Sequence, residues 1–266
     1  MHRYLPPECP YSGGTGAAET TRSRYPGRQF GPVWKTCRRN GGLAAIGSTG
    51  EEIIRASCAA FLSGRGYAAR TDFTVPGTDI FVDVAAVLPR MRDLKTRLKR
   101  GFVPTGILHH LIDAGWVSFR EIIRRTGYEP GYVTAVLEEA AAEHWIEIDG
   151  GQEDPRCRIR DYRPPAKECL LAFVGTEHLP EKMERLAELD GCYSRALFVF
   201  PYQLDDDTTE KIVGIGAGIV RYHQAHGVFQ QLIPAEVHDI EDQGRFALIV
   251  EYVLYEHVWI QAGDII

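Results

Sequence analysis

Apolar residues recur with two different periods along the chain, and the period separates expected helices from expected strands. In residues 51–66 they fall on one face of a helix, whereas residues 67–75 and 79–88 have the pattern of strands, with a Pro76-Gly77 turn between them. Similar patterns return later in the chain. They predict strands at 168–175, 195–202, 219–223 and 228–235, helices at 179–189 and 208–213, and, less clearly because of its β-branched residues, a helix at 242–261. The expected fold class is therefore α/β.

Residues 104–160 have the pattern of three short helices followed by a β-hairpin. The segment TGILHHLIDAG carries the first apolar helical face. Ser118 and Glu121 are spaced as a capping box that begins the second helix, and Gly127 ends it. Pro130 begins the third helix. Alternating apolar residues in WIEID, the turn residues DGG and the returning RCRIR then indicate a hairpin.

The segment GWVSFREIIRRTGYEPGYVTAVLEEAAAEHWIEIDGG resembles the winged helix-turn-helix family. This resemblance implies DNA binding with the third helix in the major groove. The third helix departs from the family pattern, because it carries Glu138, Glu139 and Glu143 and no Arg, Lys, Asn or Gln to read base edges. We therefore expect DNA contacts from arginines outside that helix: Arg120, Arg124, Arg125, Arg156 and Arg158. The alternatives are a structural module and contact with a protein partner through the acidic surface.

Basic residues are concentrated in two regions of a chain whose net charge is −6. Residues 1–48 carry seven Lys or Arg against two acidic side chains and have no structural period, which predicts a disordered basic tail. Residues 89–100, PRMRDLKTRLKR, carry six Lys or Arg against one acidic side chain. Met91, Leu94 and Leu98 lie at helical spacing in this segment. We expect a basic linker helix, which either contacts phosphates or is merely solvated. Its candidate contacts are Arg92, Lys95, Arg97 and Lys99.

The pieces on either side of residues 89–162 have the pattern of one discontinuous domain, residues 49–88 and 163–266. In order they contain a helix, two strands, the insert, then a strand, a helix and a strand. This order resembles the restriction-endonuclease-like (PD-(D/E)XK) nuclease superfamily. The resemblance implies a mixed sheet flanked by helices, interrupted here by the linker and by a winged-helix domain at 101–162. It also implies Mg²⁺-dependent cleavage of phosphodiesters.

The family's motif places a metal-binding Asp on one strand, a Glu-x-Lys pair on the next, and often a Glu on the first helix. Asp83 in FVDVAAV matches the Asp, and Asp79 is a second candidate ligand earlier on the same strand face. Glu51 or Glu52 matches the helix Glu. Carboxylates are the expected ligands because Mg²⁺ prefers oxygen.

The Glu-x-Lys pair is not matched, because Phe173 and Gly175 occupy its two positions. The nearest carboxylates are Glu168 and Glu177, and the nearest amines are Lys167 and Lys182. We therefore expect no cleavage with Mg²⁺ or Mn²⁺, and little loss of fold in Asp83→Asn. If the protein is active instead, relocated ligands among Asp83, Glu52, Glu168 and Glu177 would carry the chemistry.

Composition narrows the class of protein further. No run of 18 apolar residues suggests a membrane span, and the first residues have no apolar segment typical of a secretory signal. The six cysteines form no C-x-x-C pair, so neither a disulfide framework nor a zinc site is indicated. We expect a cytoplasmic, nucleic-acid-associated binding or regulatory protein on an inactive nuclease-like fold, with no cofactor. A Mg²⁺-dependent endonuclease and a protein-interaction adaptor are the alternatives.

Overall fold

The computed structural model describes residues 50–100, 107, 109–112, 114–150, 154–160, 162–175 and 177–262, with side chains for all of these except 96–100 and 256–262. The expected basic tail, residues 1–48, lies outside the described residues.

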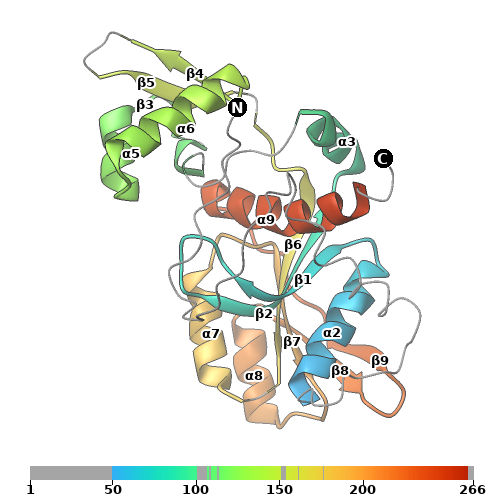
Figure 1. The fold of residues 1–266 in the computed structure, drawn as a ribbon. Coiled ribbons are helices and arrows are strands. Elements are labelled where there is room, and N and C mark those ends of the chain that lie inside the picture. The colour runs from blue at the N-terminus through green and yellow to red at the C-terminus, as the bar shows by residue number, and fades with distance from the viewer. Residues whose placement is uncertain are drawn as a thin grey trace, which may run out of the picture.

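A six-stranded mixed sheet forms the centre of the described chain (Figure 1). Its strands lie in the order β1-β2-β6-β7-β8-β9, of which β6-β7 and β7-β8 are parallel pairs and the others antiparallel. The strands span Ala68–Thr74, Phe81–Pro89, Ala166–Val174, Arg195–Phe200, Gly218–His223 and Val228–Ile233. The expected α/β class is confirmed, and helices flank this sheet.

The two faces of the sheet are covered unequally. Successive residues of β6 point to opposite faces, so Leu170 packs with α2 whereas Leu171 belongs to the core beneath the other helices. Helix α2 covers one face, and α7, α8 and α9 cover the other (Figure 1). The four helices span Gly50–Ser63, Leu179–Glu188, Asp206–Gly214 and Gln243–Ala262. The apolar run of β6 is thus buried on both sides, as a central strand requires.

A second, smaller unit contains a three-stranded antiparallel sheet of order β3-β5-β4 and two helices. The strands span Val117–Ser118, Arg156–Ile159 and Ile146–Asp149 in that order, and α5 and α6 span Phe119–Thr126 and Pro130–Ala142. The expected cap is present, because Ser118 Oγ accepts a hydrogen bond of 3.2 Å from the Glu121 backbone N–H. Gly127 ends α5 in the left-handed conformation, with φ of 66°. The unit has its own apolar core around Trp145.

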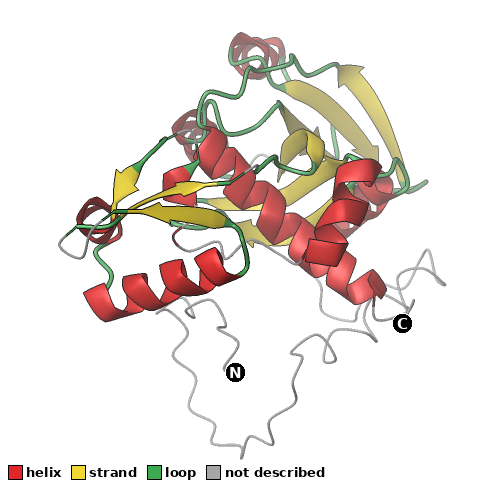
Figure 2. Cartoon of the chain, turned by 90° about the horizontal axis from the view of Figure 1, so that it is seen from above, coloured by secondary structure: helices red, strands yellow, loops and turns green. Residues whose placement is uncertain are grey.

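The small unit lies beside one end of α9 (Figure 1 and Figure 2). A hydrogen bond of 2.9 Å from the Tyr162 hydroxyl to Glu251 Oε1 ties the chain after β5 to α9. The expected linker helix is α3, Met91–Arg100, whose Leu94 is buried in the main core. No described helix is both long and apolar enough to cross a membrane.

One local expectation needs correction. Asp79 does not lie on a strand, because β2 begins at Phe81 and Asp79 is exposed in the preceding loop. The expected helix at 105–115 is described only in part, with a short 3₁₀ helix at His109–Leu111. The segment before it, residues 101–106, lies outside the described residues.

Candidate functional site

Asp83, the motif carboxylate expected from the sequence, is buried near the start of β2 with 3% of its surface exposed. Its Oδ2 accepts a hydrogen bond of 2.9 Å from the Val174 backbone N–H at the end of β6. Two cations lie beside the same carboxylate. Arg55 Nε is 3.4 Å from Oδ1, and Lys182 Nζ is 3.7 Å from Oδ2. Both oxygens of Asp83 therefore already face positive charge.

Arg55 links three carboxylates that come from different elements. It projects from α2 and forms ion pairs with Asp83 of β2 and with Asp72 of β1, and its NH2 nitrogen lies 3.9 Å from Glu51 Oε2 one turn earlier. Asp72 adopts a left-handed backbone with φ of 53°, a rare conformation for a residue other than glycine. The guanidinium thus lies between the three carboxylates.

Lys182 reaches the same place from α7, on the opposite face of the sheet from α2. The side chain is buried, and its Nζ donates a hydrogen bond of 2.5 Å to the carbonyl oxygen of Val174. Val174 therefore binds Asp83 through its N–H and Lys182 through its C=O. We call Glu51, Arg55, Asp72, Asp83 and Lys182 the Asp83 cluster.

The two positions of the expected Glu-x-Lys pair hold no ligand. Phe173 points into the core beneath α7, α8 and α9, where its ring stacks on Phe198 at 5.5 Å between centroids. Gly175 adopts φ of 79°, and a Cβ atom built on it would lie 2.1 Å from Glu51 Oε1. The carboxylate of Glu51 therefore fills the space that a lysine at this position would need.

The other predicted carboxylates are not in the Asp83 cluster. Glu168 pairs across the strands with Leu88, at the opposite end of the β2-β6 ladder from Asp83, and binds Tyr67 and Arg195 there. Glu52 and Glu177 are exposed, as is Lys167. The sequence named Glu52, Glu168 and Glu177 as ligands only if the protein is active, and the helix carboxylate that shares Arg55 with Asp83 is Glu51.

The charges of the Asp83 cluster oppose metal binding. A divalent cation bound to Asp83 would lie next to a guanidinium and an ammonium group, both of which would repel it. Within the described residues, no group of three or more His, Cys, Asp or Glu side chains has a geometry that could hold a metal ion. Burial, with a smaller contribution from Asp83, raises the pKa of the neighbouring Cys58 thiol to about 12, which disfavours the thiolate form.

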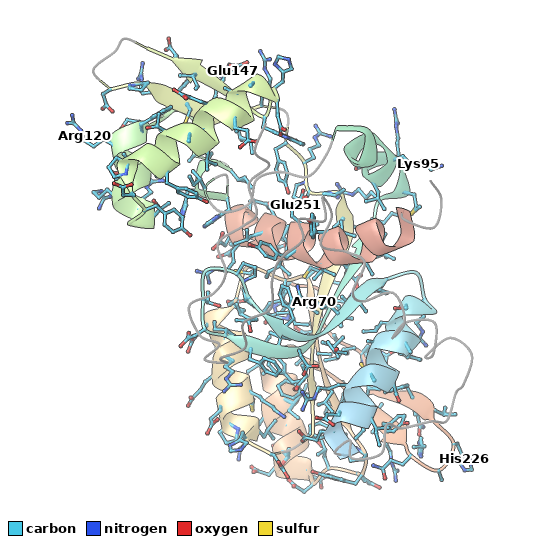
Figure 3. The ribbon with its side chains drawn as sticks, in the orientation of Figure 1. Arg70, Lys95, Arg120, Glu147, His226 and Glu251 are labelled. Carbon is cyan, nitrogen blue, oxygen red and sulfur yellow. The ribbon has the colours of Figure 1, made fainter. Side chains whose placement is uncertain are left out.

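The predicted phosphate contacts of the linker helix α3 are on its exposed side. Leu94 is buried, whereas Arg92 and Lys95 are exposed, and Lys95 points away from the protein (Figure 3). The side chains of Arg97 and Lys99 lie outside the described residues. Among its described side chains, helix α3 thus docks through Leu94, whereas Met91 is 60% exposed and Arg92 and Lys95 face solvent.

The arginines of the small unit are mostly paired with its own carboxylates. Glu121 binds Arg124 and Arg125, and the hydrogen bonds from Arg124 and then from Arg125 lower the pKa of this carboxyl group to about 2. Glu147 of β4 binds Arg158 and Arg160 on the returning side of the hairpin. Arg156 lies 3.7 Å from Asp149. Arg120 is exposed and points outward (Figure 3).

Sequence reasoning missed Arg55 altogether, and it named Lys182 only as a nearby amine. The only sequence signal for Arg55 is its place one turn after Glu51 on the expected helix, which is also typical of a solvated ion pair. Comparison with protein-family models, with curated proteins and with solved structures finds no significant match to this chain.

Proposed function

We propose that this protein binds nucleic acid without cutting it, on an inactive nuclease-like core that carries a winged-helix module. The single observation that carries the proposal is the pairing of Asp83 with Arg55 and Lys182. In an active phosphodiesterase this carboxylate would hold the cation that activates water. Here two internal cations and a backbone N–H satisfy it instead.

The strand order supports the nuclease-like part of the proposal. The resemblance implies a helix, then strands, then a helix and a strand, and the chain has α2, then β1, β2 and β6, then α7 and β7. The insertion between β2 and β6 contains the helices and the three-stranded sheet that a winged helix would have. Both assignments remain part of the proposal.

Helix α3 supports contact with nucleic acid. Its exposed Arg92 and Lys95 belong to a run of six basic residues, and phosphate contacts of this kind position a protein on a duplex without reading its sequence. DNA is the expected polymer because the small unit has the element order of a DNA-binding module.

The test combines a binding assay with a cleavage assay on the whole chain. Fluorescence anisotropy with a labelled DNA duplex should give an affinity that falls steeply with salt. In the double variant Arg92→Ala and Lys95→Ala, the slope of log affinity against log salt should flatten by up to about 1.8, because each lost phosphate contact removes about 0.9. The double variant Arg185→Ala and Lys211→Ala removes equal charge from α7 and α8 and is the matched control.

Each assay can contradict one part of the proposal. Equal slopes in wild type and in the α3 variant would exclude α3 as the contact. Cleavage of the duplex with Mg²⁺ or Mn²⁺ that is lost in Asp83→Asn would favour the alternative, a metal-dependent endonuclease with relocated ligands.

A second candidate function is protein contact through the small unit. The observation that favours it is the internal pairing of Arg124, Arg125, Arg158 and Arg160, which leaves little positive charge for phosphates. Glu138 on α6 and Glu143, which directly follows this helix, are exposed. Absence of DNA binding at low salt would favour this adaptor function.

A further inference from the structure

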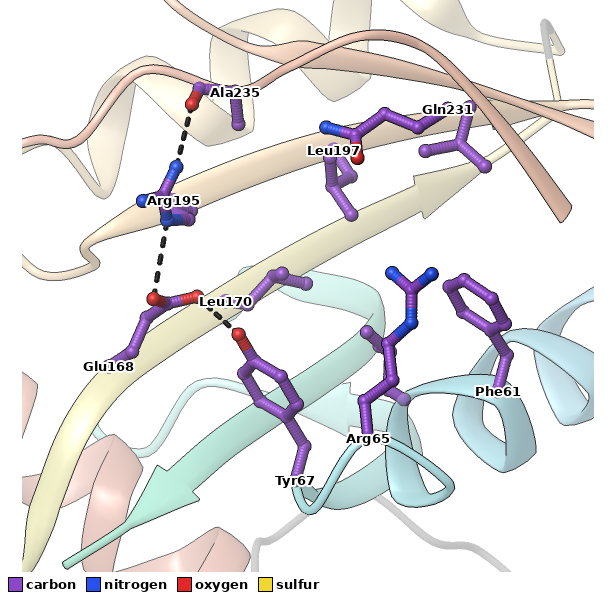
Figure 4. A pocket seen from close by; sticks show the side chains of 11 residues that line it. Phe61, Arg65, Tyr67, Glu168, Leu170, Arg195, Leu197, Gln231 and Ala235 are labelled. Carbon is purple, nitrogen blue, oxygen red and sulfur yellow. Dashed lines mark hydrogen bonds and ion pairs between the residues drawn. The ribbon is translucent and has the colours of Figure 1, made fainter.

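A pocket lies on the sheet face that α2 covers. Helix α2 packs against β1, β2 and β6, so the face is less covered toward β9. A cavity of about 280 Å³ opens there, between the end of α2 and the strands β6 to β9 (Figure 4). It is separate from the Asp83 cluster, and none of the cluster residues lines it.

The floor of the pocket is apolar. Leu170, Leu197 and Val220 come from three neighbouring strands, and Leu62 of α2 forms part of the wall. Leu170 and Val220 each have 5% of their surface exposed. Such a floor favours an apolar group of a ligand, because transferring apolar surface from water into the pocket is favourable.

One end of the pocket is closed by a chain of polar groups that satisfy one another. The Tyr67 hydroxyl donates a hydrogen bond of 2.5 Å to Glu168, Arg195 Nε lies 3.2 Å from the same carboxylate, and Arg195 also donates to the Ala235 carbonyl at 2.8 Å (Figure 4). Burial, and then the hydrogen bond to Glu168, raise the pKa of Tyr67, which keeps the phenol neutral. The charge of Arg195 is therefore compensated.

Arg65 is the cation of the pocket that lacks a carboxylate partner among the described residues. Its guanidinium carbon lies 4.0 Å from the ring centroid of Phe61, and the group points over the pocket near Gln231 (Figure 4). Stacking on an aromatic ring orients a guanidinium while leaving its N–H donors available. Among the described residues that line the pocket, Arg65, Arg195 and Glu168 carry a net charge of +1, and Arg65 is exposed to solvent.

We propose that this pocket binds a small organic monocarboxylate with an apolar body. The apolar body would lie on Leu170, Leu197 and Val220, and the carboxylate would accept paired hydrogen bonds from Arg65. Gln231 stands at the same side of the pocket and can donate a further hydrogen bond. This site does not depend on nucleic-acid binding.

The test uses the whole chain with labelled leucine and valine methyl groups and follows them by NMR. Benzoate is the probe, and benzamide is the uncharged probe of similar shape. Benzoate should shift the methyl signals of Leu170, Leu197 and Val220 saturably and bind about tenfold more tightly than benzamide, because a charge-assisted hydrogen bond is worth about one factor of ten or more.

Arg65→Gln should weaken benzoate about tenfold and leave benzamide unchanged. The matched control is Arg70→Gln, which removes an arginine that also lies over a phenylalanine, Phe73 at 5.4 Å, but does not line the pocket. Arg70→Gln should bind benzoate as wild type does. Unsaturable shifts, equal binding of the two probes, or equal loss in both arginine variants would overturn the proposal.

Discussion

The carboxylate of Glu51 lies over Gly175, so closely that a Cβ atom on residue 175 would meet Glu51 Oε1 at 2.1 Å. Gly175 follows β6 directly and has a left-handed backbone with φ of 79°. Two separate features therefore disfavour a side chain here. The backbone conformation is unfavourable for any L-residue, and the side chain of Glu51 would have to move.

Gly175→Ala should lower the free energy of unfolding by more than its conformational cost, which is about 1 kcal/mol. The matched control is Gly77→Ala, because Gly77 has φ of 78° and no atom within 4 Å of a built Cβ. Urea denaturation of both variants separates the two effects. When Gly175→Ala is made in the Glu51→Ala protein, the further loss in free energy of unfolding should equal that caused by Gly77→Ala in wild type. Equal losses in the two single variants would show that Glu51 moves aside freely.

Arg55→Met should lower the free energy of unfolding by roughly 3 kcal/mol, because it leaves a buried carboxylate without one of its partners. The side chains of Arg55 and Asp83 are only 19% and 5% exposed. Adding Asp83→Asn should recover part of the loss in a double-mutant cycle. Asp83→Asn alone should also be destabilising, which revises the sequence-based expectation of little loss of fold.

The control for Arg55 is Arg124→Met. The side chain of Arg124 is itself 73% exposed to solvent where it pairs with Glu121. The unfolding curve of this variant should overlay that of wild type, as is usual for surface pairs. If Arg55→Met unfolds at the same denaturant concentration as Arg124→Met, the Asp83 cluster contributes nothing to stability.

The small unit should lose stability as pH falls from 6.5 toward 4. Burial, and then His109 and Arg125, lower the pKa of His110 from 6.5 to about 4. The unfolded chain therefore binds the proton first, so the stability that neutral His110 contributes is fully present above pH 6.5 and lost through this interval. His110→Asn should reduce the difference between urea midpoints measured at pH 7 and pH 5. His226→Asn, in the exposed turn between β8 and β9, should leave that difference unchanged.

Glu147→Gln should strengthen DNA binding if the wing contacts phosphates. The carboxylate now binds Arg158 and Arg160 through hydrogen bonds that lower its own pKa. Removing its charge frees both arginines, so affinity should rise and the salt dependence should steepen. Anisotropy titrations at several salt concentrations measure both effects, with Glu138→Gln on α6 as the control for a lost negative charge. Equal gains in the two variants would indicate general electrostatics rather than freed wing arginines.

Local patterns in the sequence determined most of the secondary structure. The apolar run of β6, the amphipathic α2 and the capping box at Ser118 each depend on neighbours within a few residues, so the chain's own periodicity predicts them. The helix at 242–261, which β-branched residues left uncertain, forms because its apolar residues, Ile249 and Val253 among them, pack into the main core. Tertiary packing outweighs a weak intrinsic propensity there.

The sequence also indicated that Asp83 is the central carboxylate, but it did not indicate what Asp83 binds. In the sequence, Arg55 has the pattern of a solvated helix residue, and Lys182 is the one lysine of an amphipathic helix. Only the stacking of α2 and α7 on opposite faces of the sheet brings both cations to the end of β6. The same packing places Glu51 over Gly175 and leaves the pocket beside Arg65. Ion pairs between elements that are distant in sequence carry no periodic signal, so the tertiary structure alone decided them.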